Sequence, residues 1–175
     1  MPLLGYYPSV AQFKMRRKSA KAYSLTDQDY QVWVLLQQAR HAVFRAREKE
    51  LRRYGITPME SAVLFILKAI GDEATLGEIA RWLLRERHTV SSLLSRMERE
   101  GLVSKTEHSQ GKGMVRVDLT QKGKSAYEQC AKREAIRQVM SALSEEEREL
   151  LRSCLEKLRD RALEYLATRV KVPFP

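Results

Sequence analysis

Residues 75–101 read TLGEIARWLLRERHTVSSLLSRMEREG, and this stretch decides the fold. Its first half begins with Thr75 and Glu78 at the spacing of a capping box. In that motif the threonine hydroxyl and the glutamate carboxylate each accept a backbone N–H at the start of a helix. A short helix is therefore expected from Leu76 to about Leu84, followed by a turn and a second helix.

The second half of this stretch predicts a helix with two distinct faces. Its apolar stripe consists of Val90, Leu93, Leu94 and Met97, spaced so that one side of the helix can be buried. Its opposite face consists of Thr89, Ser91, Ser92, Ser95, Arg96 and Arg99. The helix should begin near His88 and end at Gly101, since glycine readily takes the left-handed conformation that closes a helix.

A β-hairpin is predicted directly after the second helix. In residues 114–119 the odd positions are apolar, whereas Arg116 points the other way, which is typical of a half-buried strand. Residues 102–107 are expected to pair with it. The loop between them, residues 108–113, carries Lys112 between two glycines.

Further helix starts are predicted at capping residues, most of which precede acidic residues or proline. These starts are Thr26 before Asp27 and Asp29, Thr57 before Pro58 and Glu60, Thr120, and Ser144 before Glu147. The first of these helices should run to about Arg53, and the second should stop at Gly71. The last carries the apolar stripe Leu151, Leu155, Leu158, Ala162, Tyr165 and Leu166. A stripe of this kind at a chain end needs a partner.

The composition is that of a soluble globular protein with an excess of basic residues. Of 175 residues, 43% are hydrophobic and 31% charged, and the length suits one domain or a binding module with a dimerisation region. Lysine and arginine number 32 against 22 acidic residues, which gives a formal net charge of +10. This excess favours a polyanionic partner such as nucleic acid, although a basic protein without such a partner fits equally well.

Most of the basic excess lies near the N-terminus. Residues 1–53 hold 11 basic and 4 acidic residues, and a basic cluster without any acid precedes Asp27. The cluster consists of Lys14, Arg16, Arg17, Lys18 and Lys21. Residues 1–25 are therefore predicted to be a basic arm, which either reaches a phosphate backbone or forms a solvated tail.

The serine-rich helix has what a helix in the major groove of DNA needs: a buried stripe, small polar residues and cations for bases and phosphates. The predicted DNA-binding residues are Arg87, His88, Thr89, Ser91, Ser92, Ser95, Arg96 and Arg99, together with Lys112 and Arg116 in the hairpin. The alternatives are an ordinary amphipathic surface helix and a solvated hairpin.

Little in the sequence indicates catalysis. His41, His88 and His108 are scattered, and neither a nucleophile motif, a phosphate loop nor a cluster with metal-ligand spacing is found. We expect no enzyme activity, no cofactor and no metal site. With no targeting or membrane-spanning segment in the sequence, a cytoplasmic, non-membrane protein is expected. Cys130 and Cys154 both lie on apolar helix faces, where buried and inert thiols are expected, with a redox sensor as the alternative.

Four segments in this order resemble the MarR family of winged helix-turn-helix transcriptional regulators. They are Thr57 to Glu60, Leu76 to Ala80, Val90 to Val103, and Leu119 to Gly123. The resemblance covers about residues 27–167 and implies a mainly α fold with a small β-hairpin wing (α+β) and long dimerisation helices at both ends. The expected organisation is an arm at 1–25, a dimerisation helix at 26–56, a winged helix-turn-helix lobe at 57–120 and dimerisation helices at 121–175.

The resemblance also implies how such a protein works. It implies a homodimer on double-stranded DNA, with two recognition helices in successive major grooves of a pseudo-palindromic operator, roughly 34 to 36 Å apart. Family members commonly repress transcription and release DNA when a small aromatic or phenolic effector binds between the dimer region and the lobe. By position, that crevice would involve Trp33, Gln37, His41 and Met59.

Two departures from the family pattern bear on the alternatives. The wing usually carries an aspartate followed closely by an arginine, whereas residues 110–113 read QGKG here. Peroxide-sensing members have a cysteine near the first helix, and this chain has none there. A repressor switched by cysteine oxidation and a winged-helix module that binds protein instead of DNA are the alternative functions.

Overall fold

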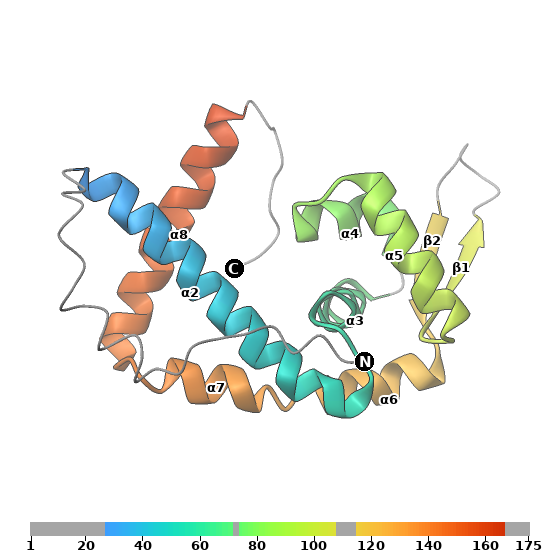
Figure 1. Ribbon diagram of the computed structural model, residues 1–175. Coiled ribbons are helices and arrows are strands. Elements are labelled where there is room, and N and C mark those ends of the chain that lie inside the picture. Colours follow the sequence, from blue (N-terminus) through green and yellow to red (C-terminus); the bar gives the residue numbers. More distant parts are fainter. Residues whose placement is uncertain (1–26, 72–73, 108–114, 167–175) are drawn as a thin grey trace, which may run out of the picture. The chain divides into compact units, whose positions relative to one another are not determined.

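The computed structural model describes residues 27–71, 74–107 and 115–166 (Figure 1). By its internal contacts the chain divides into two units, residues 1–41 and 42–175, with the boundary inside helix α2 (Gln28–Leu51). The predicted basic arm lies outside the described residues. None of the helices within the described ranges combines the length and the apolar character needed to cross a membrane.

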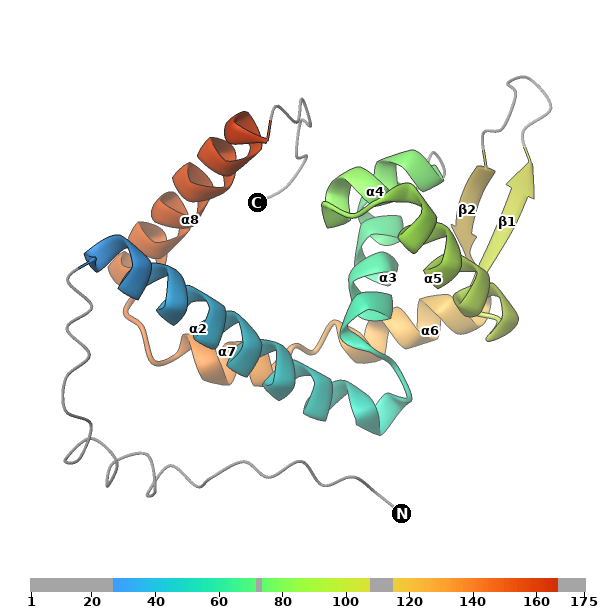
Figure 2. The ribbon, with the colours of Figure 1, turned by 45° about the horizontal axis from the view of Figure 1, so that its top comes forward.

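The second unit is mainly helical and carries a small hairpin. After the end of α2 it contains η1 (Arg52–Tyr54), α3 (Pro58–Ile70), α4 (Leu76–Leu83), α5 (Arg87–Arg99), β1 (Val103–Glu107), β2 (Val115–Leu119), α6 (Gln121–Cys130), α7 (Glu134–Met140) and α8 (Glu145–Tyr165). Helices α4 and α5 follow each other across a short turn, and the hairpin lies beside α5 (Figure 2). The predicted winged helix-turn-helix fold is confirmed.

Capping hydrogen bonds confirm the helix starts predicted at Thr57, Thr75, Thr120 and Ser144. Thr26 lies outside the described residues, and at the start of α2 the Asp27 carboxylate accepts the Asp29 and Tyr30 N–H groups. At the start of α3, Thr57 Oγ1 accepts the Glu60 N–H at 3.3 Å, while Glu60 Oε2 accepts the Thr57 N–H at 2.8 Å. Capping boxes of the same kind start α4 at Thr75 and α8 at Ser144. Thr120 caps α6, since its hydroxyl accepts a backbone N–H in the first turn.

The lobe formed by α3, α4, α5 and the hairpin packs around one apolar core. Its largest fully buried side chains include Val63, Leu64, Ile79, Val90, Leu94, Met97, Val103 and Val117. The stripe predicted on α5 supplies three of them, and its fourth member, Leu93, packs partly buried against the same core. Fully burying a side chain of this size contributes about 1.5 to 3 kcal/mol, so this stripe fixes which face of α5 points outward.

The hairpin gains a short third segment that the sequence did not predict. Strands β1 and β2 pair antiparallel, with Val103 opposite Leu119. The segment before α4 adds to the edge of β2, because the Val117 N–H donates to the Ala74 carbonyl at 2.9 Å and Thr75 forms a bridge with Arg116. The start of α4 is thereby attached to the wing.

The region after the hairpin corrects the predicted pair of helices, because a third helix, α7, lies between them. Arg133 precedes α7 with a left-handed backbone (φ 50°) and provides no side-chain cap. The cap comes from α2 instead: the Glu50 carboxylate accepts the backbone N–H groups of Glu134 and Ala135 at 2.9 and 3.1 Å. A helix start that depends on a residue so distant in the sequence leaves no local signal.

Helix α8 exposes most of the apolar face that its sequence predicts. Its exposed large hydrophobic residues are Leu150, Leu151, Leu155, Leu158, Tyr165 and Leu166. Cys154 is also exposed, which corrects the expectation of a buried thiol there. The expectation assumed that the apolar face of α8 would be covered within the chain, and the structure shows α8 without a single buried residue.

Candidate nucleic-acid interface

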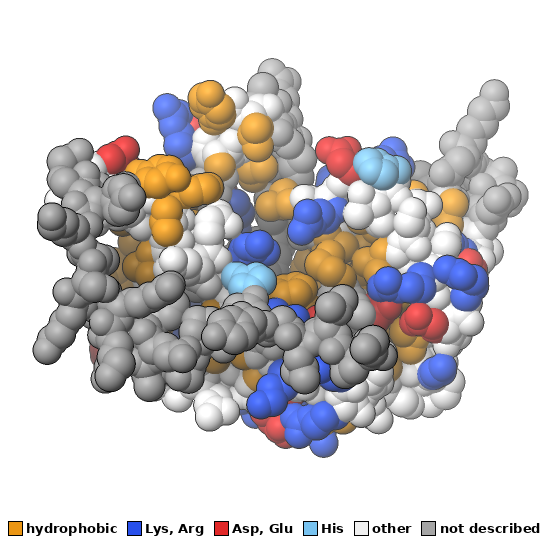
Figure 3. Space-filling view, viewed as in Figure 1, with side chains coloured by type: hydrophobic (Ala, Val, Ile, Leu, Met, Phe, Trp, Pro, Cys, Tyr) orange, Lys and Arg blue, Asp and Glu red, His pale blue; other side chains and the backbone are white. Residues whose placement is uncertain are grey.

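The face of α5 opposite the core is exposed to solvent along the helix. Arg87, His88, Thr89 and Ser92 are exposed, as is Arg99 in the last turn. The other two predicted serines, Ser91 and Ser95, are half-buried. Basic side chains and a histidine lie over α4 and α5, with acidic side chains among them (Figure 3). The open face therefore carries cations and small polar groups side by side.

The turn between α4 and α5 adds arginines that the sequence analysis did not single out. Arg81 and Arg85 are both exposed at the end of α4 and in the turn. Leu84 reverses the chain with a left-handed backbone (φ 49°), and its N–H bonds back to the last turn of α4. The run RWLLRER was visible in the sequence, and its four-residue arginine spacing was the signal that could have drawn attention to this turn.

Two of the predicted DNA-binding side chains on α5 are engaged with the lobe itself. The Arg96 guanidinium contacts Glu60 Oε1 of α3 at 2.8 and 3.0 Å. The Ser95 hydroxyl accepts a hydrogen bond from Lys105 Nζ of β1 at 2.7 Å, and the same ammonium lies 3.2 Å from Glu98. These contacts attach the second half of α5 to both of its neighbours.

The C-terminal end of α5 is attached to α6. Lys122 Nζ donates to the Glu100 carbonyl at 2.7 Å, and Thr120 Oγ1 donates to the Gly101 carbonyl at 2.6 Å. Both bonds satisfy carbonyls that a helix end leaves without an intrahelical partner, and the cation also favours the negative end of the helix dipole. The end of α5 and the start of α6 therefore form one rigid corner.

In the wing, only part of the predicted contact set can be described. Arg116 is half-buried on β2, next to the start of α4. Lys112 lies outside the described residues, so its predicted role at the tip of the wing remains a prediction.

The residues predicted to line an effector crevice are spread over both units. Trp33, Gln37 and His41 are exposed in the first unit, and the Trp33 ring stacks on Tyr30 with 5.4 Å between ring centroids. Met59 is half-buried in α3 of the second unit. Their joint role as an effector site remains a prediction.

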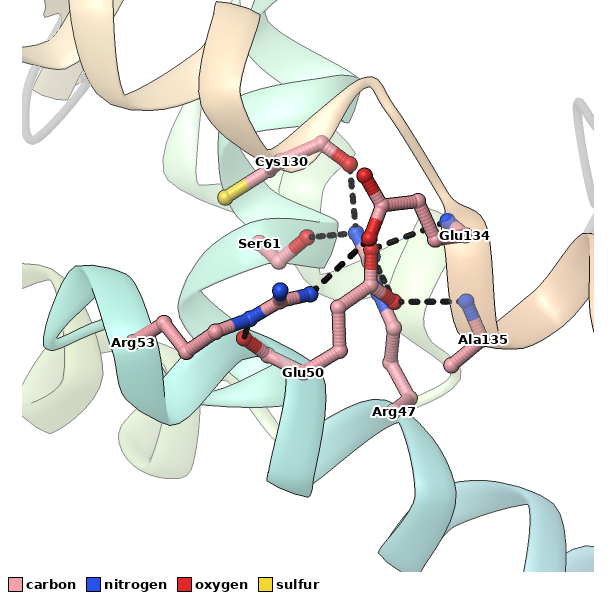
Figure 4. A network of polar contacts seen from close by, with 7 residues as sticks. All are labelled: Arg47, Glu50, Arg53, Ser61, Cys130, Glu134 and Ala135. Atoms are coloured by element: carbon pink, nitrogen blue, oxygen red, sulfur yellow. Dashed lines mark hydrogen bonds and ion pairs between the residues drawn. The ribbon is translucent and has the colours of Figure 1, made fainter.

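A buried ion pair joins the end of α2 to α3, α6 and α7 (Figure 4). Arg47 Nη1 lies 2.8 Å from the Glu50 carboxylate, and Arg47 Nη2 donates to Ser61 Oγ at 3.1 Å and to the Cys130 carbonyl at 2.7 Å. Burial by itself raises the pKa of Glu50, but the bonds from Arg47 and from the start of α7 outweigh it and hold that pKa below its ordinary value. Glu50 is therefore ionised at neutral pH.

The thiols and possible metal ligands offer little reactive chemistry. Cys130 is buried on α6, and burial raises the pKa of its thiol, which disfavours the reactive thiolate. Within the part of the chain that the structure describes, no group of three or more histidine, cysteine or acidic side chains is placed to hold a metal ion.

Comparison with known families bears on the lobe that carries this interface. A model of the MarR family matches residues 54–112, which include α3, α4, α5 and β1. The lobe is therefore similar to the winged helix of the MarR family. The resemblance predicted from the sequence is thereby confirmed, and it extends to the solved structures described next. No curated protein matches the chain.

Several solved structures of transcriptional regulators share the fold of this MarR-like chain. The organohalide-sensing regulator RdhR-CbdbA1625, in its 2,4-dichlorophenol-bound form, is 28% identical with a TM-score of 0.79, and the match covers 100% of this chain and 99% of that one. MepR of S. aureus in complex with DNA is 28% identical with a TM-score of 0.67, covering 74% and 96%. A mutant MarR from E. coli complexed with operator DNA is 21% identical with a TM-score of 0.70, covering 77% and 98%, and shows the shared fold alone.

Proposed function

We propose that this MarR-like chain is a sequence-specific regulator of transcription that binds double-stranded DNA through α5. The observation that carries the proposal is the division of α5 into a fully buried stripe and an open face with Arg87, His88, Thr89 and Ser92. A helix held in this way can lie in a major groove with small polar groups near the base edges. The similarity to the MepR–DNA complex supports the same use of the lobe.

The regulator acts as a homodimer held together by α2 and the C-terminal helices. The exposed leucines of α8 support this proposal, because an apolar stripe of this length is rarely left in water on a stable monomer. A two-fold dimer presents two copies of α5, so its operator is pseudo-palindromic, with half-sites about one turn of DNA apart. Repression follows if the operator overlaps a promoter.

A small phenol is the proposed effector. The support is the similarity, along the whole chain, to a regulator solved with 2,4-dichlorophenol bound. Trp33, Gln37, His41 and Met59 are the proposed contacts, since aromatic rings and a thioether bind an aromatic ligand while the polar groups bond its hydroxyl. Titrating 2,4-dichlorophenol into the complex of chain and DNA should release the DNA. If the complex persists at saturating phenol, this effector class is wrong.

The proposed DNA binding is tested by selecting bound duplexes from a random pool and measuring their affinity at several salt concentrations. We expect a pseudo-palindromic sequence and a steep fall of affinity with added salt, because phosphate contacts release counterions. A chain that binds no duplex at low salt would instead be a protein-interaction module. Measuring the same affinity after peroxide treatment tests the cysteine-switched alternative, which an unchanged value would remove.

A further inference from the structure

Arg96 differs from the other arginines of α5 because its guanidinium, although the side chain is 46% exposed, pairs with a buried carboxylate. Its guanidinium makes two contacts of 2.8 and 3.0 Å with one oxygen of Glu60. The Glu60 side chain is only 2% exposed, and its second oxygen accepts the Thr57 N–H at the start of α3. The same carboxylate therefore caps α3 and receives Arg96 from α5.

We propose that Arg96 is a positioning residue, which sets the orientation of α5 through Glu60 and does not itself read the DNA sequence. This inference rests on the proposed function, since it concerns how the same helix is presented to DNA. It assigns the direct contacts to the open side chains Arg87, His88, Thr89, Ser92 and Arg99.

The geometry of α5 explains why such a contact is needed. Its apolar stripe packs against α4 and the hairpin and fixes which face points outward, but an apolar contact is non-directional and tolerates small rotations. Arg96 supplies a directional contact to α3 on one side, and Ser95 and Glu98 supply another to Lys105 of β1 on the other. Base readout requires side chains held to within about 0.5 Å, which two lateral anchors can provide.

The energetics of the pair also favour a geometric role. A carboxylate buried to this extent loses its hydration, so the ion pair contributes little net stability compared with an apolar contact of the same size. What an ion pair of this kind can supply is a single preferred arrangement of the two elements that it joins. For α3 and α5, that arrangement is the angle at which α5 leaves the lobe.

The role of the Arg96–Glu60 ion pair can be tested without changing a side chain that could contact DNA, because Glu60 is buried. In Glu60→Gln the amide oxygen can still accept the Thr57 N–H, because glutamine also completes a capping box, but the side chain no longer offers Arg96 a carboxylate. The probes are the duplex selected by the unmodified chain and a scrambled duplex of equal length. The measured quantity is the ratio of the two affinities for Glu60→Gln, Arg96→Ala and the double variant.

We expect each single variant to lower this ratio about tenfold and the double variant to lower it no further, as for residues that act through one contact. The slope of log affinity against log salt should stay unchanged in all three, whereas loss of a phosphate contact changes it by about 1. Arg99→Ala is the matched control, since its exposed guanidinium bonds only the Ser95 carbonyl, at 3.4 Å, among the contacts seen for it. The decrease in the affinity ratio caused by Arg99→Ala should add to the decrease caused by Glu60→Gln.

Additive losses for Glu60→Gln and Arg96→Ala, or a reduced salt slope for Arg96→Ala, would overturn the positioning role and assign Arg96 to the DNA. If Glu60→Gln does not fold, selection from the random pool is repeated with Arg96→Ala alone. A positioning residue weakens preference at every position of the half-site, whereas a base contact relaxes it at one. If the unmodified chain selects no duplex, the proposed function fails and this inference falls with it; additive losses overturn the inference alone.

Discussion

The winged lobe and α8 carry equally clear apolar stripes, yet they differ in where those stripes lie in the folded chain. In the lobe, Leu64, Ile79 and Met97 are fully buried. In α8, Leu158 is 53% exposed and Leu150 67% exposed. An apolar stripe in the sequence therefore predicts a helix and its apolar face. Whether that face is buried within the same chain depends on the other elements of the fold.

This difference suggests separate roles in the proposed regulator, with the lobe presenting α5 and α8 forming the contact with a second chain. In the lobe, α5 contacts the apolar core, α3 and β1. These contacts fix the positions of the exposed side chains of α5. The apolar face of α8 is left exposed by the rest of the described chain, and a second copy of the chain is the proposed cover. The junction around Arg47 and Glu50 attaches the end of α2 to the lobe and to the start of α7.

The largest expected effect contrasts one leucine from each region. Leu64→Ala should lower the free energy of unfolding by about 2 to 5 kcal/mol, because it leaves a cavity in a core that cannot collapse fully. Leu158→Ala should cost less than about 0.5 kcal/mol in dilute protein, where the side chain is half exposed. Chemical unfolding at two protein concentrations measures both.

The concentration dependence decides whether the contrast holds. If self-association buries α8, the cost of Leu158→Ala grows as protein concentration rises, because only the folded dimer has that contact to lose. A cost for Leu158→Ala that is large and independent of concentration would show that α8 is already covered within a single chain.

The second prediction concerns the junction between the regions. Glu50→Gln should lower the free energy of unfolding by about 1.5 to 3 kcal/mol at neutral pH, as for other buried hydrogen bonds to a charged group. Glu48→Gln is the matched control on the same helix, since its ion pair with Arg45 is more exposed and should contribute less than about 1 kcal/mol.

The pH dependence of this loss follows from the sign of the shift. The pKa of Glu50 is lowered in the folded chain, so its ionised form contributes stability above the unfolded pKa of about 4.3. That contribution is lost as the pH falls through the lower, folded pKa. The difference between the unmodified chain and Glu50→Gln should therefore shrink between pH 5 and the folded pKa, at which ordinary glutamates are already protonated. A difference that stays constant on acidification would contradict an ionised Glu50.

The third prediction concerns the corner between α5 and α6. A Cβ at Gly123 would lie 2.0 Å from the Leu102 carbonyl oxygen, a backbone atom that cannot turn aside. Gly123→Ala should therefore cost about 1 to 3 kcal/mol through overpacking and separate the two helices slightly. Ser125→Ala, at an exposed position of the same helix, is the control and should change the melting temperature little. Equal melting temperatures for both variants would show that this corner is not closely packed.

The fold could be predicted wherever the signal is local. Thr57, Thr75 and Ser144 each start a helix with residues only three positions away, and the alternation of residues 114–119 marks β2 without any distant information. Helix α7 was missed because its cap, Glu50, lies 84 residues before Glu134. The exposed apolar face of α8 was predicted as a stripe, but the exposure of Cys154 was not, since sequence alone cannot say what covers a stripe.

The candidate interface could also be predicted only in part from the sequence. Helical periodicity was enough to identify the open side of α5, because burial of Val90, Leu94 and Met97 determines it. It could not show that Arg96 meets a carboxylate 36 residues earlier, since a surface arginine and an anchored one have the same place in the helical pattern. Which cations are available to DNA is therefore a tertiary property.

The smallest expected effect lies in the turn that joins α4 to α5. There the usual order of stability, in which alanine is more stable than glycine, should be reversed. Leu84 has a left-handed backbone (φ 49°), where glycine escapes the steric penalty that any side chain with a Cβ incurs. Leu84→Gly should therefore have a free energy of unfolding about 0.5 to 1 kcal/mol higher than that of Leu84→Ala, although glycine has the more flexible unfolded state. Chemical denaturation of both variants measures the difference. At Arg81, inside α4, the order should be the opposite, with glycine less stable than alanine by about 1 kcal/mol. Both pairs remove the side chain, so each comparison isolates the backbone. The same order at both positions would mean that the turn does not hold Leu84 in this conformation in solution, and that the entry angle of α5 is set by its lateral contacts alone.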